Sequence, residues 1–281
     1  MASGRSKAPY TWLAGFFILL AVASSSYGQQ QKQINHQIVK QMLQEVPPIS
    51  IYDDNYFVTG AAIGQKPTTE NADVKYQVSV KYRFTNAVLP LQTYLFLAYT
   101  QKAFWNIYRF SSPFKEINFH PALGLGKLLL HDGELVGALA LQVEHESNGQ
   151  DTIGSRSWNF VSFSYSGVLS PRSIITLKAW YPFLYKGDNP DLISYIGYGE
   201  AKYTYAIKKD KLLLEVSGRK GATRDWKGNL QAQLSYNPFK KPNLFLMLQW
   251  YQGYAESLSD YRQKTSIIRA GVGIKPIHYI Y

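Results

Sequence analysis

The chain has 281 residues, a formal net charge of +11 and no cysteine. Without cysteine it can form neither disulfides nor thiolate metal sites, and beyond the N-terminal region no run approaches the roughly eighteen apolar residues of a membrane-spanning helix. Aromatic residues make up 15% of the chain, yet its mean hydropathy is −0.22, a combination typical of strands with one apolar and one polar face. The positive charge favours anionic surfaces such as lipid headgroups. Because the basic residues are scattered, we do not expect a nucleic acid partner.

The N-terminus has the pattern of a secretory signal peptide. Arg5 and Lys7 precede an apolar run from Trp12 to Ala23, and small residues follow as far as Gly28. A membrane-anchor helix is the alternative, but the run is shorter than the ~20 residues that usually span a bilayer. We therefore expect residues 1–28 to be cleaved and the protein to be exported.

Residues 29–55 form a polar leader. Ile34, Ile38, Met42 and Val46 recur every four residues, a spacing that permits one short amphipathic helix closed by the prolines at 47–48. A disordered leader is the alternative, and the spacing alone does not separate the two.

Alternation of apolar and polar side chains begins at Tyr56 and continues over residues 56–281. Between Leu135 and Val143, for example, the odd-numbered residues are apolar or glycine, whereas the even-numbered ones change from small to polar. Such a period of two indicates β-strands. It fits a soluble sheet with one wet face as well as a membrane barrel with a polar interior.

The connections between the strands favour the barrel. Tight turns alternate with longer polar stretches. The turns are at 131–133, 169–172 and 208–210, and the stretches are at 104–113, 146–156, 184–191, 219–227 and 253–264. The predicted fold is therefore all-β, a transmembrane antiparallel β-barrel of about twelve strands with short periplasmic turns and longer outer loops. The aromatic ending at Tyr281 resembles an outer-membrane assembly signal.

One long loop carries residues with a defined chemistry. His145 and Ser147 lie two apart at the end of a strand and so share a face, which by parity is the apolar one. Asn159 falls on the corresponding face of the returning strand. A histidine base activates a serine hydroxyl, and an asparagine carbonyl can hold the other ring nitrogen of the histidine. These residues are a candidate Ser-His-Asn triad on the outside of the barrel.

Each of the three residues alone would be an ordinary loop residue. Polar groups on a lipid-facing surface cost free energy without partners, so all three together are harder to explain without a function. The chain contains neither a Gly-x-Ser-x-Gly elbow nor a His-Glu-x-x-His zinc motif. The remaining histidines are weaker candidates: His36, His120, His131 and His278.

The string HESNG at 145–149, followed by SRSWN at 155–159, resembles the active-site region of bacterial outer-membrane phospholipase A. Further matches run along most of the mature chain: YTQK at 99–102, SSPF at 111–114, DNPD at 188–191 and GYAESLSDY at 253–261. The resemblance implies that Ser147 is the nucleophile, His145 the base and Asn159 the residue that orients the histidine. It implies further that the backbone N–H of Gly149 donates to the oxyanion.

The resemblance also implies calcium and a homodimer. The calcium ligands would be the side chain of Ser155, the backbone carbonyl of Gln150 and, in the dimer, the partner subunit's Ser111. Calcium prefers oxygen ligands of this kind. Gln101 would form a hydrogen bond across the dimer interface within the membrane.

The expected function is calcium-dependent hydrolysis of phospholipid acyl esters at sn-1 and sn-2, and of lysophospholipids, activated by dimerisation. The expected location is the outer membrane of a Gram-negative bacterium, with the active site at the outer leaflet. One alternative is a catalytically silent barrel acting as a pore or scaffold. About twelve strands leave limited room for a channel, and interior charges could pair and fill it: Glu200, Lys202, Glu215 and Arg269. A soluble secreted β-protein is the other alternative.

Overall fold

The structure, a computed structural model, describes residues 33–84, 89–239 and 243–276. The predicted signal peptide at 1–28 and the predicted assembly signal at Tyr281 lie outside the described residues. The first residues of the polar leader lie outside them too.

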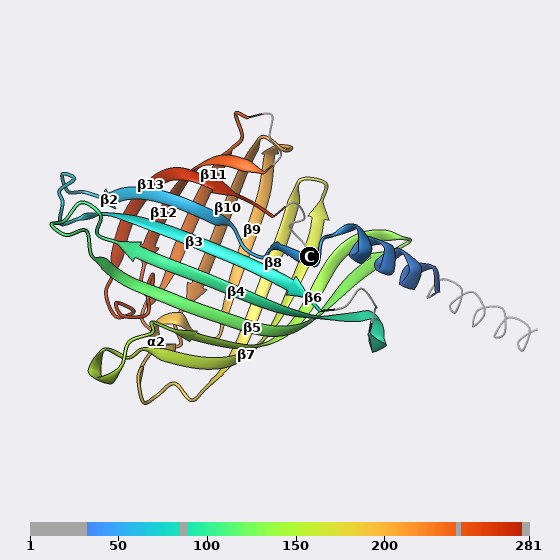
Figure 1. Cartoon of the computed structure of the whole chain (residues 1–281), viewed down its shortest axis with the longest axis horizontal. Helices are drawn as coiled ribbons and strands as arrows, with labels where there is room; N and C mark the ends of the chain where they lie inside the picture. The colour runs from blue at the N-terminus through green and yellow to red at the C-terminus, as the bar shows by residue number, and fades with distance from the viewer. Residues whose placement is uncertain (1–32, 85–88, 240–242, 277–281) are drawn as a thin grey trace, which may run out of the picture.

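Antiparallel strands within the described ranges form one sheet, and β2 to β13 close it into a twelve-stranded barrel (Figure 1). Each strand pairs with its neighbours in sequence, and β2 completes the ring by pairing with both β3 and β13. The bounds are β2 Asn55–Ala62, β3 Ala72–Arg83, β4 Thr93–Trp105, β5 Phe114–His131, β6 Glu134–Ser147, β7 Ser157–Ser170, β8 Ser173–Phe183, β9 Gly199–Lys208, β10 Leu212–Lys220, β11 Gly228–Tyr236, β12 Leu244–Gly253 and β13 Thr265–Ile274. The short strand β1 (Ile49–Ile51) pairs with β3 beside the start of β2.

The connections differ between the two ends of the barrel. Tight turns join β5 to β6, β7 to β8 and β9 to β10, whereas the connections after β4, β6, β8, β10 and β12 are longer. The 3₁₀ turn η2 (Thr152–Gly154) lies in the β6–β7 loop and the short helix α2 (Ile193–Ile196) in the β8–β9 loop; another turn, η1 (Pro90–Gln92), precedes β4. The predicted barrel of about twelve strands with alternating turns and loops is confirmed.

The wall of the barrel is apolar outside and polar inside. On β6, Leu141 and Val143 are 50% and 55% exposed, while the intervening Gln142 is buried. On β7, Phe163 is half exposed and the adjacent Ser162 is buried. An outward apolar face over a polar interior is the arrangement of a membrane-spanning barrel. Helices in the described part of the chain are all too short or too polar to cross a membrane.

A helix from the polar leader packs at the end of the barrel that carries the tight turns. Residues 33–45 are helical, and Val39 and Leu43 pack against Tyr94 and Phe96 of β4 and Leu128 of β5. The buried residues Val39 and Leu43 thus each follow directly after a residue of the four-residue repeat noted in the sequence, Ile38 and Met42. This is because the helix rests on the inner side of the β4–β6 wall, which the repeat alone does not specify.

The opposite end is covered by loops that fold inward. Leu192 and Ile196 at α2 pack with Leu258 and Tyr261 of the β12–β13 loop and with Trp158 of β7. In Figure 1, α2 and the N-terminal helix lie at opposite ends of the barrel. Each end of the interior is therefore lined by an apolar cluster.

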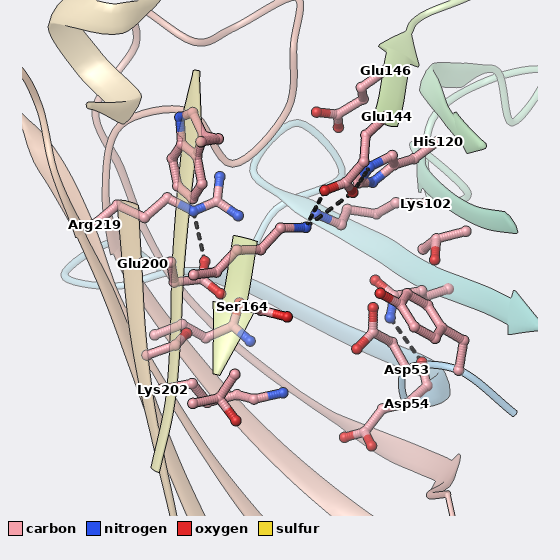
Figure 2. Close-up of a pocket in the computed structure, with 18 of the residues that line it drawn as sticks. Asp53, Asp54, Lys102, His120, Glu144, Glu146, Ser164, Glu200, Lys202 and Arg219 are labelled. Carbon is pink, nitrogen blue, oxygen red and sulfur yellow. Dashed lines mark hydrogen bonds and ion pairs between the residues drawn. The ribbon is translucent and has the colours of Figure 1, made fainter. Parts of the chain in front are cut away.

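Between these clusters the barrel contains a polar chamber of about 420 Å³ (Figure 2). Charged side chains from different strands and loops pair inside the barrel, and several of them line this chamber. The pairs include Lys178 and His120 with Glu144, Arg219 with Glu200, Lys275 with Glu215 and Asp54, and Arg269 with Asp73 and Glu256. Lys202 lines the chamber (Figure 2). Glu200, Glu215 and Arg269 thus pair in the interior, as the sequence suggested.

Candidate active site

His145 and Asn159 lie directly opposite each other on β6 and β7. The ring nitrogen Nδ1 of His145 lies 2.9 Å from the amide oxygen Oδ1 of Asn159, within hydrogen-bond distance. An amide oxygen can only accept, so this bond selects the tautomer with its proton on Nδ1. The other nitrogen, Nε2, is left with a lone pair and is able to act as a base.

Ser147 is the last residue of β6 and shares the outward face with His145, two positions before it. Its neighbours across the strands are Ser157 of β7 and Phe119 of β5. The hydroxyl of Ser147 forms no hydrogen bond with any described residue. Such a serine is open to a histidine base, and this bond commonly tightens only when substrate is present.

Gly149 follows in the β6–β7 loop with a left-handed backbone, at φ +66°. A Cβ atom built on it would lie 2.7 Å from the ring of Phe119. Both the conformation and the close ring require glycine here. The loop thereby brings a backbone N–H group close to the end of the strand that carries Ser147.

The hydroxyls of Ser155 and Ser157 both donate to one carboxylate oxygen of Asp188, at 3.0 and 2.7 Å. Asp188 belongs to the β8–β9 loop, and the motif DNPD that contains it was noted in the sequence without a role. Its contact with Ser155 adds a carboxylate to the candidate calcium ligands.

The chemistry of this donor set fits calcium, which takes hydroxyl, carbonyl and carboxylate oxygens. The described residues contain no group of three or more histidine, cysteine, aspartate or glutamate side chains that could hold a metal. A site here would therefore depend on a serine hydroxyl, a backbone carbonyl, one carboxylate and water. Gln150, whose carbonyl is the predicted ligand, is exposed in the same loop.

The residues predicted to act in the dimer lie apart from this loop. Ser111 is exposed in the β4–β5 connection, with a left-handed backbone at φ 62°. Gln101 is part-exposed on β4, and its amide oxygen accepts a hydrogen bond from the Tyr99 hydroxyl at 3.0 Å. The amide nitrogen of Gln101 keeps its two protons for other partners.

A second contact between loops lies beside the site. Asp191 accepts hydrogen bonds from Tyr261 and Arg262 of the β12–β13 loop. Burial acts to raise the pKa of the Asp191 carboxyl, but the bonds from Arg262 and Tyr261 outweigh it and hold the pKa below its ordinary value. Burial and the neighbouring Asp191 raise the pKa of Tyr261 to about 12. The pair therefore stays a phenol and a carboxylate at neutral pH.

Comparison with known proteins identifies the family. A family model described as phospholipase A1 matches residues 32–275. The chain belongs to the phospholipase A1 family. Phospholipase A1 of Salmonella typhimurium is 32% identical over 258 residues, which are 84% of this chain and 85% of that protein. The family predicted from the sequence is therefore confirmed. The predictions of an outer-membrane barrel and of a carboxylic ester hydrolase are confirmed with it.

Solved structures agree with this assignment. The outer membrane phospholipase of Salmonella typhi, a dimer with bound calcium, superposes with a TM-score of 0.74 and 29% identity, covering 86% of this chain and 98% of that one. An active-site mutant of Escherichia coli outer membrane phospholipase A, in which an asparagine is replaced by alanine, gives a TM-score of 0.73 and 27% identity. It covers 87% of this chain and 99% of the other.

Proposed function

We propose that this protein hydrolyses the acyl esters of phospholipids at sn-1 and sn-2, and of lysophospholipids, with Ser147 as nucleophile, His145 as base and Asn159 as the residue that orients the histidine. The observation that carries the proposal is the 2.9 Å hydrogen bond between His145 Nδ1 and Asn159 Oδ1, formed on the outward face that also bears Ser147. The related E. coli enzyme was solved as an active-site mutant of an asparagine, which supports a catalytic asparagine in this family.

The reaction follows from the positions of these groups. Ser147 Oγ attacks the ester carbonyl while His145 Nε2 takes its proton. The carbonyl oxygen becomes an oxyanion, which the backbone N–H of Gly149 stabilises. The oxyanion collapses, the glycerol oxygen leaves with the proton from His145, and an acyl-serine remains. Water, deprotonated by His145, then releases the fatty acid and restores Ser147.

Calcium is the metal that this site would take. Its ligands would be the side chain of Ser155, the carbonyl of Gln150, the carboxylate of Asp188 and, in a dimer, the partner subunit's Ser111. When bound, calcium would act as a Lewis acid that lowers the energy of the developing oxyanion. The relative from Salmonella typhi, solved with calcium, supports this assignment.

Dimerisation would join two barrels along the outward faces that carry Gln101. The amide protons of Gln101 are available to a partner, because its oxygen is already bound to Tyr99. A polar group on a lipid-facing wall gains free energy from such a partner. The triad lies at the end of the barrel with the long loops, which in barrels of this kind is the outer end. We therefore assign the active site to the outer leaflet.

Hydrolysis in mixed micelles tests the proposal. We expect wild-type protein to release fatty acid, and Ser147→Ala to lose that activity while it folds into the same barrel. Addition of EDTA should abolish the activity and excess calcium should restore it. Full activity in Ser147→Ala would exclude Ser147 as the nucleophile. Activity unaffected by EDTA would exclude the role of calcium but would leave the proposed triad valid.

A further inference from the structure

The β6–β7 loop is folded around the side chain of Asn148, the residue that directly follows Ser147. Asn148 is 5% exposed. Its oxygen Oδ1 accepts hydrogen bonds from the backbone N–H groups of Gln150 at 3.3 Å and Arg156 at 3.0 Å. Its nitrogen Nδ2 donates to the backbone carbonyl of Gly154 at 2.9 Å. One amide thus satisfies three backbone groups of a loop without regular secondary structure, apart from one 3₁₀ turn.

These bonds hold both ends of the segment that contains the functional groups. The backbone N–H of Asn148 also donates to the carbonyl of Arg156 at 2.9 Å, which closes the base of the loop. Between these closures lie Gly149, with its oxyanion N–H, and Ser155, with its calcium-binding hydroxyl. Without the amide, the backbone of this segment would be free to rotate and to bind water instead.

The amide is itself anchored to the rest of the barrel. Nδ2 of Asn148 also donates to the hydroxyl of Ser259 in the β12–β13 loop, at 3.2 Å. The backbone N–H of Ser259 in turn donates to the carboxylate of Glu116 on β5, at 2.9 Å. Glu116 is 3% exposed. A part-buried chain of hydrogen bonds therefore connects the loop to a strand of the barrel, the kind of support that keeps a site in its productive geometry.

We propose that Asn148 is a positioning residue of the active site. Its amide fixes the N–H of Gly149 and the oxygens of Gln150 and Ser155 in the arrangement that receives the oxyanion and calcium. The side chain of Asn148 is buried and forms its hydrogen bonds only with the β6–β7 and β12–β13 loops, so it acts through these groups. This inference rests on the proposed function, because it takes Ser147 as the nucleophile. Displacement of a catalytic group by ~1 Å can cost about 10²-fold in rate.

Three variants and one matched control test the role. Asn148→Ala removes all the side-chain bonds. Asn148→Asp keeps the acceptor for the N–H groups of Gln150 and Arg156 and loses both donors. Ser259→Ala removes only the outer anchor. The control is Asn71→Ala, because Asn71 Nδ2 donates to the backbone carbonyl of Lys66 at 2.9 Å in the β2–β3 loop, which takes no part in this network.

Activity in mixed micelles, measured across a calcium titration, is the main readout, and the mobility of the unheated barrel in SDS gels reports folding. We expect kcat to fall about 10²-fold in Asn148→Ala with little change in KM, as when an oxyanion donor is lost. The calcium concentration for half-activation should rise in the same variant. Asn148→Asp should lie between Asn148→Ala and wild type, Ser259→Ala should lose less than Asn148→Ala, and Asn71→Ala should match wild type.

A folded Asn148→Ala with wild-type kcat and wild-type calcium response would overturn the inference. If Asn148→Ala does not fold, Asn148→Asp is the deciding variant. A folded Asn148→Asp with the same kcat and the same calcium response as wild type would also overturn the inference. Ser147→Ala separates the two proposals. If Ser147→Ala is inactive and Asn148→Ala is fully active, only the positioning role of Asn148 is rejected. If Ser147→Ala keeps its activity, the proposed triad itself is rejected.

Discussion

Ser155 and Asp188 are 33 residues apart in the chain, yet the Ser155 hydroxyl donates to the Asp188 carboxylate at 3.0 Å. The bond joins the β6–β7 loop, which holds the candidate oxyanion donor, to the β8–β9 loop. Ser157 donates to the same carboxylate oxygen. The shared carboxylate is the single charged group in the proposed calcium site, so its removal is the most direct test of that site.

Asp188→Asn should weaken calcium activation. The amide keeps an oxygen but loses the negative charge, and calcium affinity depends on the number of charged ligands. We expect the calcium concentration for half-activation to rise about tenfold, equivalent to ~1.4 kcal/mol, while activity at saturating calcium changes little. Asp191→Asn is the matched control, since Asp191 lies in the same loop and bonds to Tyr261 and Arg262. Equal shifts in both variants would mean that the loop, not the ligand, was altered.

Asn159→Ala should lower kcat by ~10²-fold or more, within the range that general-base catalysis contributes. The substitution removes the acceptor for Nδ1–H and lets the His145 ring rotate or take the wrong tautomer. Asn159→Asp restores an acceptor and should recover much of the activity. Steady-state kinetics on folded protein measures both variants, and equal activity in Asn159→Ala and wild type would contradict the orienting role.

Gly149→Ala should reduce kcat by roughly 10²–10³-fold, the loss seen when one oxyanion donor is removed. A Cβ there is strained by the positive φ and would lie 2.7 Å from the Phe119 ring. Gly154→Ala is the matched control in the same loop. Its Cβ would meet only the end of the Gln150 side chain at 2.6 Å, which is free to move. A similar loss of kcat in both variants would argue against the donor role of Gly149.

The barrel was predictable from the sequence because its signals are local. A period of two in the side chains and the alternation of turns with loops specify strand number and ends. The same parity places Leu141 and Val143 outside and Gln142 inside, as their exposures show. Parity and the chemistry of the residue types also singled out His145, Ser147 and Asn159, which the barrel register brings to one face. The resemblance added Gly149, the calcium ligands and the dimer.

The sequence did not indicate the contacts between loops. Asp188 reaches Ser155, and Asn148 reaches Ser259, only because the barrel brings the ends of distant strands together. Neither contact has a periodicity or a characteristic spacing. The buried face of the N-terminal helix was missed for a similar reason, since it is selected by the inner wall at β4 and β5.

Glu256 is a buried carboxylate in the β12–β13 loop that binds Lys75 and Arg269. Burial acts to raise the pKa of Glu256, but Lys75 and Arg269 outweigh it and lower the pKa to about 2. In the unfolded chain a glutamate has a pKa of ~4.3. The stabilisation is therefore fully present above pH ~4.3 and is lost as pH falls towards 2.

Glu256→Gln should destabilise the barrel at neutral pH by about 3–5 kcal/mol, because Lys75 loses its buried partner. The difference from wild type should shrink as pH falls from about 4 to 2, where the wild-type carboxylate is also protonated. Urea unfolding in detergent, followed by tryptophan fluorescence at several pH values, measures both effects. Glu70→Gln is the control, since its ion pair with Arg109 is exposed and should contribute less than ~1 kcal/mol. A destabilisation by Glu256→Gln that stays constant from pH 7 to 2 would show that packing, not charge, is responsible.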